Sequence, residues 1–297
     1  MSKNGTFLFL RAYMDYHSDR FLDHSLMYYD ERGHLKAIMP ANEKANALYS
    51  HQGLTYGGLV LPVKTHITEV GQMFEATIQY LREHGMTEWY YKQMPSVYHT
   101  IPAEEDEYWL WRYHAETVAC NMMTAIDLHS SMGIVSARKR TYLSKLTKEG
   151  YAIDFCSPIT DFWTILEENL MERFHATPVH SLQEILMLQG HFPQSIVCCT
   201  VRNPEGIVVA GTLLFITDRV VRTQYISASP EGKRCNALDF LMLSLVKEYR
   251  QKQGYHYFEF GTSMADDGIS LNEGLILQKE GFGGRSIACK TYKIRIT

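Results

Sequence analysis

The sequence predicts an α/β protein, with a mixed sheet of the α+β type, that is built from two domains of the same kind. The strongest observation is an order of elements that occurs twice: an apolar strand, a long amphipathic helix, a helix-ending glycine and an aromatic strand. A repeat spaced by roughly 170 residues indicates two pseudo-equivalent domains, because solenoid repeats are much shorter. The length supports this interpretation, since 297 residues, 45% of them hydrophobic, suffice for two cores.

The first copy of this order lies in the N-terminal half. An apolar run at residues 54–63 predicts a strand, and residues 65–84 carry apolar side chains at helical spacing. A glycine ends that helix, and the aromatic residues 89–91 predict the strand that follows. Upstream, the runs 7–14 and 35–39 predict two further strands.

The second copy lies in the C-terminal half. The run 220–228 predicts a strand, residues 236–253 a long helix, and residues 255–260 the aromatic strand. The elements expected before it are two helices that begin near Pro158 and Ser181 and a hairpin of two strands, residues 196–201 and 207–216. After it we expect a short helix and a final strand on the same sheet.

A basic segment marks the junction between the two copies. Residues 136–150 contain five cations, at Arg138, Lys139, Arg140, Lys145 and Lys148. They form either a solvated helix that links the domains or a positive surface that faces an anionic ligand. We place the boundary near residue 145, with an N-terminal domain of residues 1–145 and a C-terminal domain of residues 146–297.

Composition narrows the class of protein. The net charge of −4 argues against bulk nucleic-acid binding. Residues 1–5 lack the apolar core of a signal peptide, and the apolar runs fall short of the roughly 18 residues that span a membrane. The expected location is therefore the cytoplasm. The six cysteines form no Cys-x-x-Cys pair, so the sequence predicts free thiols and no metal site.

Residues 229–236 (SPEGKRCN) are the main candidate for a binding site. They join a strand to a long apolar helix, and a helix start presents unpaired N–H groups and a partial positive charge. Gly232 permits close approach of a ligand, and Lys233 and Arg234 add full positive charge, which suits a phosphate or pyrophosphate. The alternative is an ordinary helix entry, capped by Asn236, with two solvated basic residues.

This layout resembles the fold of GNAT acyltransferases, in which a strand, a pyrophosphate-binding loop, a helix and a splayed strand hold acetyl-CoA. The resemblance implies acetyl-CoA or another acyl-CoA as donor substrate, without a metal. The usual loop reads Gln/Arg-x-x-Gly-x-Gly/Ala, whereas this chain has Cys235 and Asn236 where small residues are typical. The expected donor-binding residues are Ser227, Ala228, Gly232, Lys233, Arg234, Cys235 and Asn236.

A closer resemblance, over most of the chain, is to the FemAB-like branch of that superfamily, which has two GNAT-like domains in tandem. Besides the duplication and the basic segment, it rests on residues 257–263 (YFEFGTS), similar to that family's Phe-Asp-Phe-Gly-x-Ser strand end. Residues 274–284 (GLILQKEGFGG) are similar to its Phe-Lys-x-x-Phe-Gly segment. The chain has no inserted coiled-coil arm of the kind found in some Fem transferases that use aminoacyl-tRNA.

The resemblance implies transfer of an acyl group to an amine, which requires a base for the amine proton and donors for the oxyanion. Glu259, at a strand end, is the expected base, with a strand-end salt bridge as the alternative. Ser263 and Asn272 would orient substrate or leaving group, unless they are cap or turn residues. Lys279 matches the Fem-type lysine and would bind substrate, with a solvated helix lysine as the alternative.

The first domain is expected to contribute to acceptor binding. His51, Tyr56 and Gly57 lie in a segment rich in glycine and aromatic residues, which predicts a bent strand or loop at an exposed edge. The alternative for Tyr56 is packing of an edge strand.

The sequence therefore predicts an N-acyltransferase that moves an acyl group, from an acyl-CoA, to an amino group on an amino sugar or peptide precursor of the cell surface. One alternative keeps the fold and uses aminoacyl-tRNA as donor, which is the only nucleic-acid partner expected. Another is a non-catalytic protein that binds a glycan or nucleotide-sugar. The oligomeric state is open.

Overall fold

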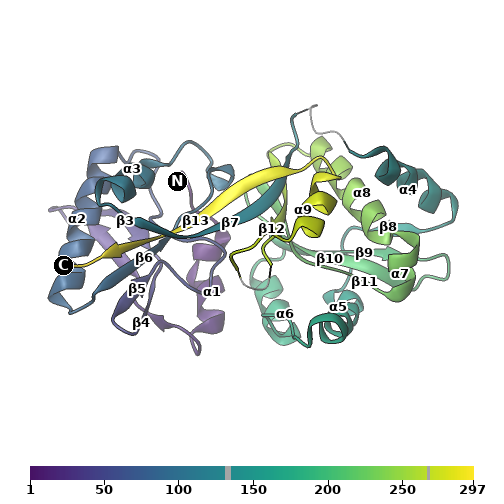
Figure 1. Ribbon diagram of the computed structural model, residues 1–297, viewed down its shortest axis with the longest axis horizontal. Helices are drawn as coiled ribbons and strands as arrows, with labels where there is room; N and C mark the ends of the chain where they lie inside the picture. Colours follow the sequence, from purple (N-terminus) through teal and green to yellow (C-terminus); the bar gives the residue numbers. More distant parts are fainter. Residues whose placement is uncertain (131–134, 266–267) are drawn as a thin grey trace. The chain divides into compact units, whose positions relative to one another are not determined.

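The computed structural model describes residues 1–130, 135–265 and 268–297. Two compact units form: unit 1 contains Met1–Met122 and Ile287–Thr297, and unit 2 contains Met123–Ala265 and Leu271–Ser286. The chain passes into unit 2 along β7 (Glu116–Asp127) and returns to unit 1 along β13 (Arg285–Arg295), both visible in Figure 1. This division differs from a single boundary near residue 145, because the last strand belongs to unit 1.

Unit 1 is built on a mixed sheet in the order β1-β4-β5-β6-β13. Strands β5 and β6 are parallel, and β13 is antiparallel to β6. A separate hairpin of β2 and β3 and three helices complete the unit. The elements are β1 (Leu22–Asp23), β2 (Leu26–Tyr29), β3 (Leu35–Met39), β4 (Asn42–Lys44), β5 (Ala47–Tyr49), β6 (Glu88–Lys92), α1 (Arg11–Met14), α2 (Ile67–Glu83) and α3 (Glu105–Arg112).

Helix α2 covers this sheet because its apolar stripe is continuous. Val70, Phe74 and Leu81 are fully buried and pack with Trp89 and Tyr91 of β6. The predictions of α2, β3 and β6 are therefore confirmed, to within about two residues.

Two strands predicted in unit 1 are wrong. Residues 7–14 form a 3₁₀ turn, Phe7–Phe9, and the short helix α1. Residues 54–63 form no strand, and only isolated bridges occur there. The reason is local: a Cβ on Gly57 would lie 1.7 Å from the Ser50 carbonyl oxygen, so the chain folds back tightly on itself. The strand that precedes α2 is instead β5.

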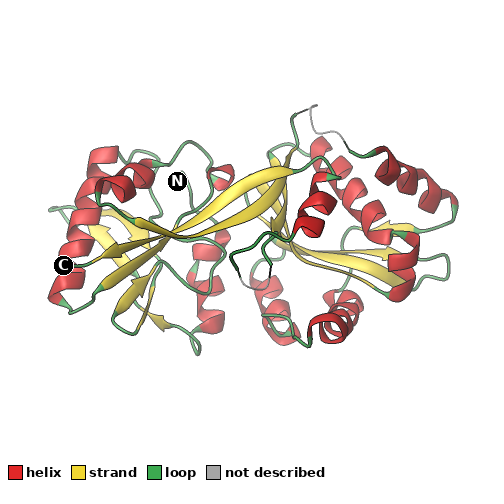
Figure 2. Ribbon diagram, viewed as in Figure 1, coloured by secondary structure: helices red, strands yellow, loops and turns green. Residues whose placement is uncertain are grey.

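Unit 2 is a sheet in the order β7-β12-β11-β10-β9-β8. Helices α5 and α6 lie below the central strands in Figure 2, and α8 lies above them. Helix α4 packs along α8. The elements are α4 (Ala137–Lys148), β8 (Ala152–Asp154), α5 (Ile159–Phe174), α6 (Leu182–His191), β9 (Ile196–Arg202), β10 (Val208–Ile216), β11 (Val220–Ala228), α7 (Pro230–Cys235), α8 (Ala237–Gln251), β12 (Tyr257–Thr262) and α9 (Glu273–Glu280).

The elements of unit 2 follow the sequence closely. The capping box at the start of α6 is present: the Ser181 hydroxyl accepts from the Glu184 N–H at 3.2 Å, and the Glu184 carboxylate accepts from the Ser181 N–H at 2.7 Å. The hairpin of β9 and β10 and the strand β11 are confirmed. The long helix is confirmed as α8, whose buried side chains, including Phe240, Leu241 and Leu245, join the core.

The two central strands of unit 2 are parallel and then separate. β11 and β12 pair from Val220 opposite Tyr257 to Arg222 opposite Glu259, whereas β11 continues to Ala228. A bulge in β11 falls at Gln224, because Leu213 pairs with Tyr225 and the next residue of β10 pairs with Thr223. The sheet therefore opens beyond this point. The parallel strand–helix–strand unit of β11, α8 and β12 has its counterpart in β5, α2 and β6 of unit 1.

Candidate functional site

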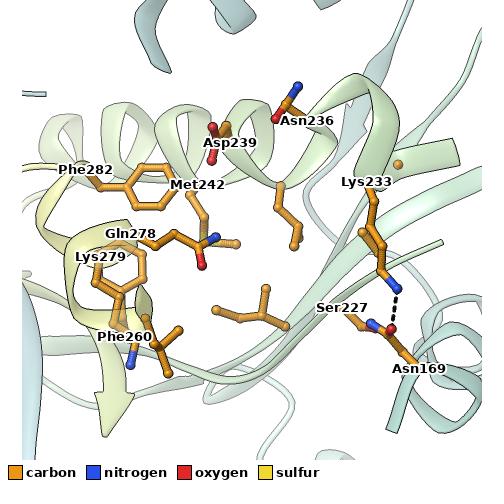
Figure 3. Close-up of a pocket in the computed structure, with 15 residues that line it drawn as sticks. Asn169, Ser227, Lys233, Asn236, Asp239, Met242, Phe260, Gln278, Lys279 and Phe282 are labelled. Atoms are coloured by element: carbon orange, nitrogen blue, oxygen red, sulfur yellow. Dashed lines mark hydrogen bonds between the residues drawn. The ribbon is translucent and has the colours of Figure 1, made fainter. Parts of the chain in front are cut away.

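A cavity of about 380 Å³ occupies the opening between β11 and β12. Helix α8 forms one side, α9 another, and α7 closes one end (Figure 3). All of its lining belongs to unit 2. The lining residues are Asn169, Ile226, Ser227, Ala228, Gly232, Lys233, Asn236, Leu238, Asp239, Met242, Phe260, Leu275, Gln278, Lys279 and Phe282.

The segment expected to be an open anion-binding loop is the short helix α7. The Ser229 hydroxyl accepts from the Gly232 N–H at 3.2 Å, and the Ser229 carbonyl accepts from the Lys233 N–H at 2.9 Å. A Cβ on Gly232 would lie 2.1 Å from the Val209 carbonyl oxygen. Gly232 therefore permits close packing of α7 on β10, and two of the N–H groups that could meet a pyrophosphate already have partners within the helix.

Asn236 separates α7 from α8. Its backbone is left-handed, with φ of 61° and ψ of 42°, a conformation that asparagine tolerates better than most residues. The reversal ends α7 and starts α8 without a side-chain cap from Asn236.

A polar chain of three side chains closes the α7 end of the cavity. The Lys233 ammonium donates to the Asn169 side-chain oxygen at 2.5 Å, drawn as a dashed line in Figure 3. The Asn169 amide donates to the Ser227 hydroxyl at 2.7 Å, which donates to the Ile165 carbonyl at 3.2 Å. These contacts hold an exposed cation at the rim, in position to meet an anionic group of a ligand.

The opposite wall is aromatic and carries a carboxylate. The rings of Phe260 and Phe282 stack with centroids 5.4 Å apart, and the Lys139 ammonium lies 3.8 Å from the Phe282 centroid. The same ammonium forms a 2.7 Å ion pair with Asp239 of α8. The Gln278 amide points into the middle of the cavity in Figure 3. The cavity thus combines an apolar interior with a few polar groups, as small-molecule sites do.

Lys279 is buried at the strand end of this cavity rather than solvated. Its ammonium donates to the carbonyls of Gly261 and Thr262, at 3.0 and 2.6 Å, and to the Ser263 hydroxyl at 2.8 Å. Desolvation by burial lowers the pKa of Lys279 to about 8, while the Glu259 charge opposes this shift. The lysine therefore fixes the end of β12 and places a cationic group beside the cavity.

Glu259 points away from solvent and is fully buried. Its Oε2 accepts from the Arg222 guanidinium at 2.7 Å, and its Oε1 accepts from the Gly261 N–H. The Arg222 Nε also donates to the Gln224 side chain at 3.3 Å. This is the geometry of the strand-end salt bridge, and the role of Glu259 as base stays a prediction.

Ser263 and Asn272 hold the chain between β12 and α9. The Ser263 carbonyl accepts from the Asn272 N–H at 2.9 Å. The Asn272 side chain accepts from the Leu275 N–H at 3.0 Å and thereby caps α9. Both residues support the position of Lys279, and neither lines the cavity.

The three residues expected to bind an acceptor from the first domain are in the interior of unit 1. His51 is buried and stacks on His17, with centroids 4.9 Å apart. Desolvation lowers the pKa of His51 to about 4, and the nearby His17 contributes. Tyr56 is 1% exposed and packs against Phe9 and Tyr98. The burial of His51 and Tyr56, and the packing of Gly57 against the chain, argue against direct contact with an acceptor.

Six of the predicted residues meet at the cavity, and the structure adds others from distant parts of the sequence. The six are Ser227, Ala228, Gly232, Lys233, Asn236 and Lys279. Arg234 is exposed and Cys235 packs against the core, so both lie outside the lining. Sequence reasoning missed Asn169, Asp239 and Gln278. Only Asp239 had a signal in the sequence, because its carboxylate interrupts an otherwise apolar helix.

Within the parts of the chain that the structure describes, no group of three or more His, Cys, Asp or Glu side chains could hold a metal ion. Across the same ranges, no helix combines the length and apolar character needed to cross a membrane.

Comparison of the sequence with protein-family models and with curated proteins gives no match. Solved structures do match. The structure of FemX has a TM-score of 0.71 at 11% identity, covering 99% of this chain and 93% of that one. L-PGS from Bacillus licheniformis gives 0.62 at 14% identity, covering 92% and 84%. A tandem GNAT protein from the clavulanic acid biosynthesis pathway gives 0.50 at 11% identity, covering 97% and 88%.

These likenesses extend over nearly the whole chain. They confirm the fold that the sequence resemblance implied. The chain has the GNAT-superfamily fold in its FemAB-like form, with two tandem GNAT-like domains.

Proposed function

We propose that the protein is an N-acyltransferase whose acyl donor lies in the unit 2 cavity. The observation that carries this proposal is the cavity itself, which opens where β11 and β12 part and has cationic groups at two ends, Lys233 and Lys279. Its volume of about 380 Å³ lies within the range of small-molecule sites.

The chemistry uses few groups. The nitrogen of a neutral acceptor amine attacks the acyl carbonyl carbon, the bond from that carbon to the donor's sulfur or oxygen breaks, and the amine loses a proton to a base. A backbone N–H at the Gln224 bulge is the donor we assign to the developing oxyanion, and the positive charge of Lys279, whose three N–H groups are bonded to Gly261, Thr262 and Ser263, adds a favourable field. Glu259 is the base that the sequence suggests, and its ion pair with Arg222 must loosen for that role.

Each of the two substrates is assigned a chemical class. The proposed donor is an acyl-CoA, since Lys233 at the rim of the cavity is placed to meet its phosphates. The acceptor is an amine on an amino sugar or peptide precursor of the cell envelope, in the cytoplasm.

Thermal unfolding with acetyl-CoA, coenzyme A and longer acyl-CoAs tests the donor. A ligand at about 100 times its dissociation constant adds about 2.7 kcal/mol of stability. We expect the shift to be lost in Lys233→Ala, which removes the cation that lines the cavity. Arg234→Ala is the matched control, because it removes the same charge one residue along α7, outside the lining. An equal loss in both variants, or no shift with any acyl-CoA, would contradict this donor.

Two observations favour aminoacyl-tRNA as a second candidate donor. The N–H groups of Gly232 and Lys233 are bonded within α7, which leaves fewer donors for a pyrophosphate. The Asp239 carboxylate lines the cavity and could bind the ammonium of an aminoacyl group.

The exposed cations of α4 suit an RNA backbone in this second reading. They include Arg138, Arg140 and Lys148, on a helix whose Lys139 reaches Asp239. RNase treatment separates the two donors, since only transfer from charged tRNA is abolished by it. Transfer from a charged tRNA should also weaken steeply with salt.

A further inference from the structure

A second cavity, of about 710 Å³, lies entirely within unit 1. It is bounded by α3, by the chain that follows β6 and by the middle of β13. None of the proposed acyl-transfer chemistry uses this second cavity, so binding of a ligand there is independent of the proposed function. The lining residues that carry the argument are Gln93, Glu104, Glu107, Tyr108, Trp111 and Lys290.

Two aromatic side chains are exposed along this cavity. Tyr108 and Trp111 are three residues apart on α3 and therefore lie on the same side of the helix. They are 46% and 71% exposed, and their ring centroids are 5.9 Å apart with planes inclined by 43°. The third aromatic residue of the helix, Trp109, instead donates its indole N–H to the Ile67 carbonyl at 2.7 Å. The exposed pair is thus available to a ligand.

The polar groups of the cavity carry both signs of charge. The Lys290 ammonium donates to the Glu107 carboxylate at 2.9 Å, and the Tyr292 hydroxyl donates to the same carboxylate at 2.9 Å. Glu104 adds an exposed carboxylate. The Gln93 amide donates to the buried Asp106 at 3.2 Å, which orients its carbonyl oxygen. The site therefore offers hydrogen-bond donors and acceptors side by side with aromatic faces.

These groups select a neutral polyhydroxylated ring. Lys290 is already paired with Glu107, and Glu104 leaves one net negative charge, so an anion is repelled and the remaining groups are suited to hydrogen bonds with a neutral ligand. A pyranose has apolar C–H faces that pack on aromatic rings, and hydroxyls that both donate and accept. We propose that the groove formed by Tyr108, Trp111 and Glu104 is a sugar-binding site of unit 1.

Isothermal titration of the full chain with neutral trisaccharides tests this site. The probes are the trimers of N-acetylglucosamine, glucose linked α1→4 and glucose linked β1→4, each at up to about 10 mM. We expect at least one to bind and Trp111→Ala to weaken its binding more than tenfold. Glu104→Ala should weaken it less, because one hydrogen bond is lost and the aromatic face remains.

Tyr29→Ala is the matched control, since Tyr29 is a 56% exposed aromatic residue of the β2–β3 hairpin in the same unit. It should leave binding unchanged. All three positions are exposed, so the thermal midpoints should stay close to that of the wild type. The proposal is overturned if no trisaccharide binds, or if Trp111→Ala binds as tightly as the wild type. Loss of self-association in Trp111→Ala, without sugar binding, would assign the face to contact between copies of the chain.

Discussion

Replacement of Glu259 by glutamine separates a structural from a catalytic role for this carboxylate. Glu259 is fully buried, and the side chain of Arg222 is only 14% exposed, so their 2.7 Å ion pair is shielded from water. In Glu259→Gln, the amide oxygen can still accept from the Gly261 N–H. The Arg222 guanidinium, however, loses the carboxylate charge with which it pairs at 2.7 Å.

The expected cost follows from this burial. Removal of one member of a buried pair costs about 3–5 kcal/mol, because the remaining charge is left without compensation. Arg222 keeps some contact with solvent, so we expect the lower value, about 3 kcal/mol. For a unit of this size that corresponds to a fall in unfolding midpoint of about 6–12 °C.

A double-mutant cycle measures the pair directly by urea denaturation. Arg222→Met removes the cation and keeps an apolar side chain of similar length. The double variant Arg222→Met/Glu259→Gln should therefore be about 2 kcal/mol more stable than the sum of the two single changes predicts. A loss below about 1 kcal/mol in Glu259→Gln would refute the reasoning. If that variant, kept folded, retains full acyl transfer at every pH, Glu259 is not the base.

Three further predictions concern stability. Gly232→Ala should destabilise unit 2 by about 1–3 kcal/mol, since its Cβ would lie 2.1 Å from the Val209 oxygen. In the same urea titration Gly190→Ala, in α6 and with nothing within 4 Å, should be neutral or stabilising by up to about 1 kcal/mol, because alanine is the better helix former. The pKa of Lys279 is about 8 in the folded chain and 10.5 in the unfolded chain, so between these values the unfolded chain binds more protons. The unfolding free energy should therefore rise with pH from about 8 to 10. This rise should be smaller in Lys279→Met. The pKa of His51 is lowered from 6.5 to about 4 in the folded chain, which predicts a loss of stability as the pH falls through that window. His51→Asn should reduce this loss because it removes the imidazole, and asparagine tolerates the φ of 62° at this position. A flat pH dependence in the wild type would contradict either assignment.

The fold of unit 2 could be largely predicted because its elements are long and regular. β10 and β11 are nine-residue strands joined by a tight turn, and α8 has a continuous apolar stripe. In unit 1 the strands β1, β4 and β5 have two or three residues each, too few for an alternating pattern to show. Residues 104–107 are all acidic, a composition typical of a solvated turn, yet Glu105 starts α3 and Asp106 is buried there.

The division into units depends on tertiary pairing that no local pattern reveals. β13 pairs with β6 across about two hundred residues of chain, and β7 pairs with β12. The same reason explains why only part of the site was predicted. The segment from Ser227 to Asn236 is contiguous and has a recognisable composition, whereas Asn169 and Gln278 reach the cavity from helices far away in the sequence.

Acyl transfer in a single turnover, with the cavity blocked, tests the central claim most directly. Leu238 lines the cavity from α8, and Leu238→Trp would fill it; Leu277→Trp, at a position that is 67% exposed on α9, is the matched control. With either donor, we predict that Leu238→Trp remains folded and loses transfer to an amine, while Leu277→Trp retains it. Transfer at the wild-type rate in Leu238→Trp would show that the acyl donor does not lie in this cavity.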